Sequence, residues 1–180
     1  MRLSFVTPLF PPDVHAVALY HKALVGELAK THNTTALIYG KYPEAVERVT
    51  FVAIDKQEHK RARVIKMLLA LLKARSTTDV YLITNGPSTE LPALVLSYLT
   101  RKPIILLQSD WIMYSRFNGF FSNRLIKRIE HTINVMVISD LIKPEIHPLL
   151  PYPTEAITRY EKEWDEHTSA ISQLVYYVGT

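Results

Sequence analysis

The chain has 180 residues, of which 48% are hydrophobic and 21% charged, with a formal net charge of +4. These proportions are typical of one globular domain and exclude a disordered, fibrous or membrane-spanning protein. The chain contains no cysteine, which excludes thiol catalysis, cysteine-ligated metals and disulfide bonds and favours a cytoplasmic location.

Short apolar runs alternate with amphipathic segments along the chain. The apolar runs predict six β-strands, at 3–7, 35–39, 49–54, 80–84, 103–107 and 134–138. The amphipathic segments predict helices at 14–30, 59–75, 89–99 and 120–131, followed by an acidic helix at 154–173. A strand-like run occupies 174–178.

Strands separated by helices are typical of βαβ units with right-handed crossovers. Such units build a parallel sheet that is covered on both faces. We therefore predict an α/β fold, a single Rossmann-like doubly wound domain with a mostly parallel sheet of about six strands. This domain is expected over residues 1–150, and residues 151–180 are predicted to form a Pro-rich connection, the acidic helix and a terminal strand.

Basic residues are concentrated in the predicted domain. Residues 1–150 contain 19 Lys and Arg against 12 Asp and Glu, whereas residues 151–180 contain 2 against 5. This balance suits phosphorylated substrates, anionic lipid or nucleic acid. Because no nucleic-acid-binding motif accompanies it, we expect no nucleic-acid partner.

Candidate ligand-binding residues follow from the predicted fold, since ligands of open α/β sheets bind beyond the carboxyl ends of the strands. His15 opens the first predicted helix at this edge, and a ligand role and a structural role are equally balanced for it. Asp110 follows the fifth strand without apolar periodicity after it, which favours a functional carboxylate. Asp140 is better explained as a helix cap. The polar residues of these loops are Asp13, His15, Asn85, Ser88, Glu90, Gln108, Ser109, Asp110, Ser139, Asp140 and Lys143.

Several cofactor motifs are absent from the sequence. Neither G-x-G-x-x-G after the first strand nor G-x-x-x-x-G-K-[ST] occurs, which excludes dinucleotide-binding and P-loop motifs. The seven histidines never show the i, i+4 spacing of a helical metal site. We therefore expect no metal and no cofactor.

Two segments form a candidate membrane or acceptor surface. The predicted helix 59–75 carries a broad apolar arc, with Arg63, Lys66 and Lys73 on the opposite side. A basic amphipathic helix can lie on anionic lipid, although packing of the apolar arc on the sheet is the favoured alternative. The aromatic stretch 111–121 resembles an interfacial anchor or an acceptor pocket and contributes Trp111, Phe117, Phe120 and Phe121. These segments predict peripheral contact with the inner face of the membrane.

Three segments in chain order resemble a known family. Residues 2–30 combine a strand, a Pro-Pro loop and a long helix, residues 79–111 contain Asn-Gly-Pro, Leu-Pro-Ala and Lys-Pro, and residues 135–146 form a final strand segment. This ordered set resembles the amino-terminal domain of the family 4 glycosyltransferases, which have the GT-B fold. The run at 173–180 resembles the opening strand of that family's second domain, which this chain has no room to contain.

The resemblance implies metal-free transfer of a sugar from a nucleotide-sugar donor to an acceptor that is lipid-linked or otherwise hydrophobic. The chain would be the acceptor-binding half, inactive alone and dependent on a donor-domain partner chain or a missing C-terminal domain. Asp110 would orient or deprotonate the acceptor hydroxyl, and His15 would face the donor phosphates. The implied substrate-binding residues are Asp13, His15, Asn85, Gly86, Glu90, Gln108 and Trp111.

The sequence also departs from the family pattern. His15 and Ala16 stand where the family often has Gly-Gly, and Gln108 to Trp111 stand where many members have a histidine. A side chain in the first loop obstructs the approach of a donor phosphate to the backbone. These departures favour an alternative hypothesis, a non-catalytic binding module that retains a GT-B-like fold.

Overall fold

The computed structural model describes residues 1–84, 86–108, 124, 136–138 and 154–180. Within this part, the strands are β1 (Arg2–Thr7), β2 (Asn33–Tyr39), β3 (Val49–Ile54), β4 (Val80–Thr84), β5 (Ile104–Gln108) and β6 (Met136–Ile138). The helices are α1 (Ala16–Thr31), α2 (Lys60–Ala74), α3 (Pro87–Leu99) and α6 (Thr154–Gly179). The predicted helix at 120–131 and the Pro-rich connection, with the domain boundary at 150, lie outside the described residues.

The six strands form one sheet in the order β3-β2-β1-β4-β5-β6, and every neighbouring pair is parallel. Phe5 in the central strand β1 lies opposite Ala36 of β2 and Leu82 of β4. The chain first adds strands outward from β1 to β3, returns to β4 beside β1, and then adds strands toward the other edge. This arrangement confirms the predicted α/β, doubly wound, Rossmann-like fold.

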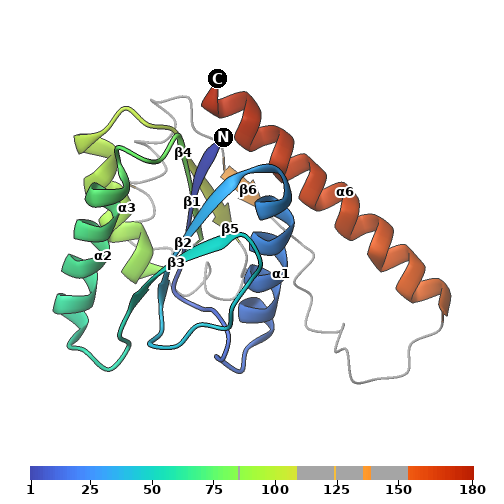
Figure 1. Ribbon diagram of the computed structural model, residues 1–180, viewed down its shortest axis with the longest axis horizontal. Coiled ribbons are helices and arrows are strands. Elements are labelled where there is room, and N and C mark those ends of the chain that lie inside the picture. The colour runs from blue at the N-terminus through green and yellow to red at the C-terminus, as the bar shows by residue number, and fades with distance from the viewer. Residues whose placement is uncertain (85, 109–123, 125–135, 139–153) are drawn as a thin grey trace.

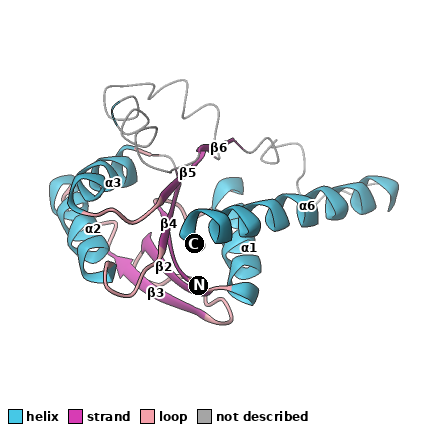
Figure 2. Cartoon of the chain, turned by 90° about the horizontal axis from the view of Figure 1, so that it is seen from above, coloured by secondary structure: helices cyan, strands magenta, loops and turns pink. Residues whose placement is uncertain are grey.

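Helices cover both faces of the sheet (Figure 1), with α2 and α3 on one face and α1 and α6 on the other. Neighbouring residues of β1 point to opposite faces, since Phe5 belongs to the same buried cluster as Leu24 of α1, whereas Val6 belongs to the cluster that contains Met67 of α2. The view from above separates the same two layers (Figure 2). Because both faces of the central strands are buried, their sequences are continuous apolar runs rather than alternating ones.

The carboxyl-terminal segment corrects one prediction. The run at 174–178 was expected to be a strand, but it forms the last turns of helix α6. Ile171, Val175 and Val178 are buried, whereas Tyr176 and Tyr177 are exposed, so burial follows the helical period and not the alternation of a strand. The β-branched and aromatic residues of this run are typical of strands in composition, but their burial is that of a helix.

Helix α6 packs across α1 on one face of the sheet. The Tyr20 hydroxyl lies 2.9 Å from the His167 Nε2, and the rings of Tyr20 and Trp164 meet edge to face at 5.7 Å. Ile171 and Val175 continue this contact into the core beneath α1. Among the described helices none combines the length and the apolar character that crossing a bilayer requires.

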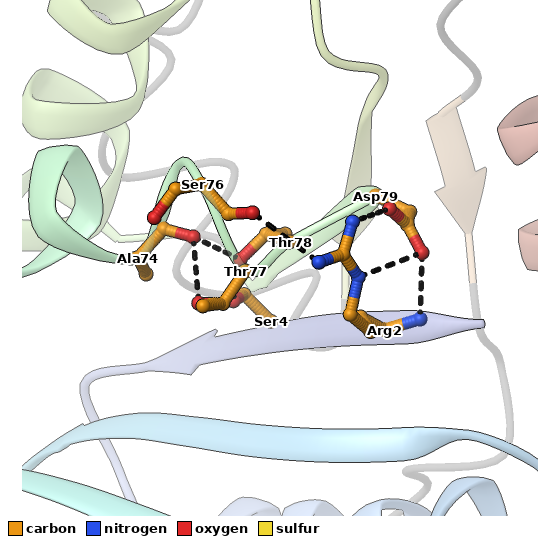
Figure 3. Close-up of polar contacts among 7 residues, drawn as sticks. All are labelled: Arg2, Ser4, Ala74, Ser76, Thr77, Thr78 and Asp79. Atoms are coloured by element: carbon orange, nitrogen blue, oxygen red, sulfur yellow. Dashed lines mark hydrogen bonds and ion pairs between the residues drawn. The ribbon is translucent and has the colours of Figure 1, made fainter.

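The amino edge of the sheet is closed by paired polar groups (Figure 3). Asp79 accepts hydrogen bonds from the backbone N–H and the guanidinium of Arg2, with the shortest at 2.6 Å. The hydroxyls of Ser4 and Thr78 lie 2.7 Å apart, and Thr78 donates to the carbonyl of Ala74. These contacts join the start of β1 to the turn before β4.

Candidate functional site

The strand order reverses between β1 and β4, so the loops that follow these two strands leave the sheet in opposite directions. In open α/β sheets this point is where ligands bind. The two loops touch there, because a Cβ at Gly86 would lie 3.3 Å from Cγ of Pro8. Gly86 has a φ of +148°, a conformation essentially restricted to glycine. The backbone conformation therefore favours glycine at this position, and a side chain there would also be crowded by Pro8.

The loop between β1 and α1 is held by contacts of its own side chains. His15 is the N-cap of α1, and its Nδ1 accepts a hydrogen bond from the N–H of Val17 at 3.2 Å. The carboxylate of Asp13 accepts from the N–H of Phe10 at 3.1 Å and forms an ion pair with Lys56. Asp13 and His15 thus lie at the predicted edge, and the contacts shown for them are structural.

Glu90 and Gly86 belong to the first turn of α3. The N–H of Gly86 donates to Oε1 of Glu90 at 3.1 Å, and the hydroxyl of Thr89 donates to the carbonyl of Thr84 at 2.8 Å. Glu90 is buried, and the positive end of the helix dipole favours a carboxylate in this position. Glu90 therefore fixes the loop after β4, a role that the sequence did not distinguish from ligand binding.

Arg63 and Tyr39 lie where the first turns of α2 and α3 meet. The Tyr39 hydroxyl donates to the carbonyl of Ser88 at 2.9 Å, and the Arg63 guanidinium lies over the Tyr39 ring at 5.8 Å from its centroid. Burial raises the pKa of Tyr39 to about 12, so the hydroxyl keeps its proton. Within the described part of the chain, Arg63 forms no ion pair with a carboxylate.

The predicted basic surface is divided by the structure. Arg63 is half-buried at the carboxyl edge of the sheet, whereas Lys66 and Lys73 are exposed on the outer side of α2. Lys66 forms an ion pair with Glu58. The sequence grouped the three cations because they share one side of the helical projection, but the projection does not give the rotation of the helix relative to the sheet.

His21 is a buried residue of this edge that the sequence did not single out. Its Nδ1 lies 2.9 Å from the carbonyl oxygen of Leu9 and 2.8 Å from Oγ1 of Thr7. A carbonyl oxygen only accepts, so Nδ1 carries a proton toward Leu9. Burial lowers the pKa of His21 to about 4, which keeps the imidazole neutral. The signal in the sequence is the position of His21 among the apolar residues of α1.

The other predicted site residues are not placed relative to the loops after β1 and β4. Gln108 is the last residue of β5 and so belongs to the carboxyl edge. The remaining ones lie outside the described residues, and their roles stay predictions: Asn85, Ser109, Asp110, Trp111, Phe117, Phe120, Phe121, Ser139, Asp140 and Lys143. Among the described residues there is no cluster of three His, Asp or Glu side chains that could hold a metal ion.

A cavity of about 380 Å³ lies at the opposite end of the sheet, where α1 ends beside α6. The Nε2 of His32 lies 3.0 Å from the hydroxyl of Ser172, while its Nδ1 is buried without a hydrogen-bond partner among the described residues. Burial lowers the pKa of His32. The other residues that line this cavity are Met1, Thr31, Gln173 and Tyr176.

Comparison with known proteins identifies the fold but no family. No family model matches the sequence, and no curated protein matches it. A solved structure that is similar is the C-terminal domain of the coenzyme A biosynthesis bifunctional protein CoaBC, with a TM-score of 0.50 and 12% sequence identity over 96% of each chain. At this identity the likeness establishes the fold alone.

This comparison corrects the functional prediction from sequence. The similar structure described above is a domain of CoaBC and not a GT-B glycosyltransferase. The predicted resemblance to family 4 glycosyltransferases, the acceptor-binding role with a nucleotide-sugar donor and the GT-B-like binding module are therefore wrong. The segments behind these predictions are a strand followed by a Pro-rich loop, and a helix that contains Pro near its start. Such features occur in doubly wound sheets of many functions.

Proposed function

We propose that the chain binds a small phosphate-bearing molecule at the carboxyl edge of the sheet, between the loops after β1 and β4. The observation that carries the proposal is the half-buried Arg63, whose guanidinium lies over the Tyr39 ring and pairs with no described carboxylate. Guanidinium groups bind phosphate through two parallel hydrogen bonds.

The surroundings of Arg63 support this choice of ligand. The Tyr39 hydroxyl lies between the carbonyls of Ser88 and Arg63, at 2.9 and 3.5 Å, and so holds the starts of α2 and α3 together. Helix N-termini carry a partial positive charge that favours anions. Because all the strands are parallel, α1, α2 and α3 each begin at this edge.

The choice of probes follows from phosphate chemistry and from the structural neighbour. That neighbour is a domain of a protein of coenzyme A biosynthesis, and coenzyme A is itself a phosphorylated nucleotide. We would therefore measure thermal unfolding of the chain with pyrophosphate, ATP and coenzyme A. Saturation of a specific site by at least one of them is expected to raise the Tm by about 5 °C.

Substitutions of arginine localise the binding. Arg63→Ala is expected to abolish the rise in Tm, and Arg63→Lys to reduce it because an ammonium cannot form the paired hydrogen bonds. The matched control is Arg101→Ala, which removes an exposed arginine from the turn before β5, at the amino edge. The proposal would be contradicted if a probe still raised the Tm of Arg63→Ala as much as that of the wild type. It would also be contradicted if none of the probes raised the Tm of the wild type.

A further inference from the structure

The outer side of α2 carries exposed apolar residues that its packing on the sheet does not require. Met67 and Leu71 are fully buried, whereas Ile65 and Leu69 on the opposite side have exposed fractions of 56% and 59%. Ile65 and Leu69 are one helical turn apart and therefore adjacent on the surface. The apolar arc of α2 is thus wider than the face that the core buries.

Cations flank this apolar pair on both sides. At 100° per residue, Arg61 lies on one flank of Ile65 and Leu69, and Lys66 and Lys73 lie on the other. All three cationic residues are exposed, and α2 contains five Lys and Arg but no Asp or Glu. Glu58, just before the helix, forms an ion pair with Lys66 and leaves Arg61 and Lys73 without a carboxylate partner among the described residues. We call these five residues, Arg61, Ile65, Lys66, Leu69 and Lys73, the α2 outer face.

Exposed apolar residues also occur where α2 and α3 end. The guanidinium of Arg75 donates to the carbonyl of Leu99 at 3.1 Å, which joins the ends of α2 and α3. Tyr98 and Leu99 are both large exposed residues there, with exposed fractions of 64% and 50%. Tyrosine is enriched at the boundary between lipid and water because its ring is apolar and its hydroxyl polar.

We propose that the α2 outer face binds the surface of an anionic lipid bilayer. Ile65 and Leu69 enter the boundary between headgroups and acyl chains, and the flanking cations remain at the level of the lipid phosphates. Each Lys or Arg near an anionic membrane contributes attraction that salt weakens, whereas the apolar contribution does not depend on salt. The charge of the face is complementary to acidic headgroups, and a neutral bilayer lacks that partner.

Vesicle sedimentation tests this proposal with the full chain. One vesicle population contains phosphatidylcholine alone, and the other contains equal parts of phosphatidylcholine and phosphatidylserine. We expect the chain to sediment with the second population and not the first, and to be released when salt is raised. Equal binding to both populations, or no binding to either, would overturn the proposal.

A matched pair of double variants localises the contact. Leu69→Ser with Lys73→Glu is expected to weaken binding to anionic vesicles at least about tenfold. Leu19→Ser with Lys41→Glu changes charge and hydropathy equally, at an exposed leucine of α1 and an exposed lysine after β2, and is expected to leave binding unchanged. Circular dichroism shows whether both variants remain folded. Equal losses in the two folded variants, or retention of an acidic polypeptide such as poly-glutamate without vesicle binding, would overturn the proposal.

Discussion

The two edges of the sheet use their polar residues differently. At the amino edge Arg2 pairs with Asp79, and Ser4 pairs with Thr78. Arg101 is exposed at the same edge and lies outside this network. At the carboxyl edge Asp13, Glu90 and His21 are likewise engaged in holding loops. The Arg63 guanidinium lies over the Tyr39 ring and forms no ion pair with a carboxylate of the described residues. Under the proposed function, the paired residues at the amino edge stabilise the fold, whereas Arg63 at the carboxyl edge is the cation available to a ligand.

The largest expected effect concerns His21 at the carboxyl edge, because its burial makes the stability of the fold depend on pH. Its pKa of about 4 lies below the value of about 6.5 in the unfolded chain. The unfolded state therefore binds more protons, and the free energy of unfolding falls by up to about 3 kcal/mol as the pH drops from about 6.5 to about 4. Chemical denaturation of the wild type at several pH values measures this loss.

The variant His21→Asn isolates this contribution, because its side-chain amide can donate to Leu9 but does not titrate. Its stability is expected to depend less on pH in the same range than that of the wild type. His32 and His167 also have lowered pKa values, caused chiefly by burial, and they retain part of the dependence in the variant. Identical pH profiles for the two proteins would show that His21 is not held neutral by burial.

The next effect in size concerns the contact between the two carboxyl-edge loops. Gly86→Ala introduces a Cβ 3.3 Å from Pro8 at a φ of +148°, and we expect a loss of about 2 kcal/mol in the free energy of unfolding. Gly26→Ala is the control. Gly26 lies within helix α1, and its added Cβ would make an ordinary contact of 3.5 Å with Val46. That variant is expected to be neutral or slightly stabilising, and an equal loss in both would refute the role of Gly86.

The smallest effect concerns the amino edge. Hydrogen bonds from Arg2 lower the pKa of Asp79 to about 2. The pair is partly exposed, so solvent screens it, and we expect Asp79→Asn to cost about 1 kcal/mol at neutral pH. Because the folded-state pKa of this carboxyl is depressed, its contribution is present above about pH 4 and is lost as the pH falls toward about 2. If Asp79→Asn were as stable as the wild type at neutral pH, or if it changed ligand binding, the division between the two edges would be contradicted.

The fold is well predicted from the sequence because a continuous apolar run of strand length indicates a strand that is buried on both faces of the sheet. The six strands and the carboxyl-edge loops could be inferred in this way. The rotation of α2 could not, since Arg63, Lys66 and Lys73 share one side of the helix and only packing separates them. The burial of His21 depends on the path of the loop above it, and the end of α6 depends on contacts with α1. Those features arise from tertiary structure, which local patterns do not contain.

Amide NMR of the ¹⁵N-labelled chain, titrated with pyrophosphate and with the nucleotide that gives the largest rise in Tm, tests most directly whether the carboxyl edge is the ligand-binding edge. The proposed function predicts saturable shifts of the resonances of His15, Arg63, Gly86 and Ser88, with those of Arg2, Thr78 and Asp79 unchanged. Shifts confined to the amino edge, or to His32 and Ser172 at the cavity between α1 and α6, would contradict it, as would the absence of any shift.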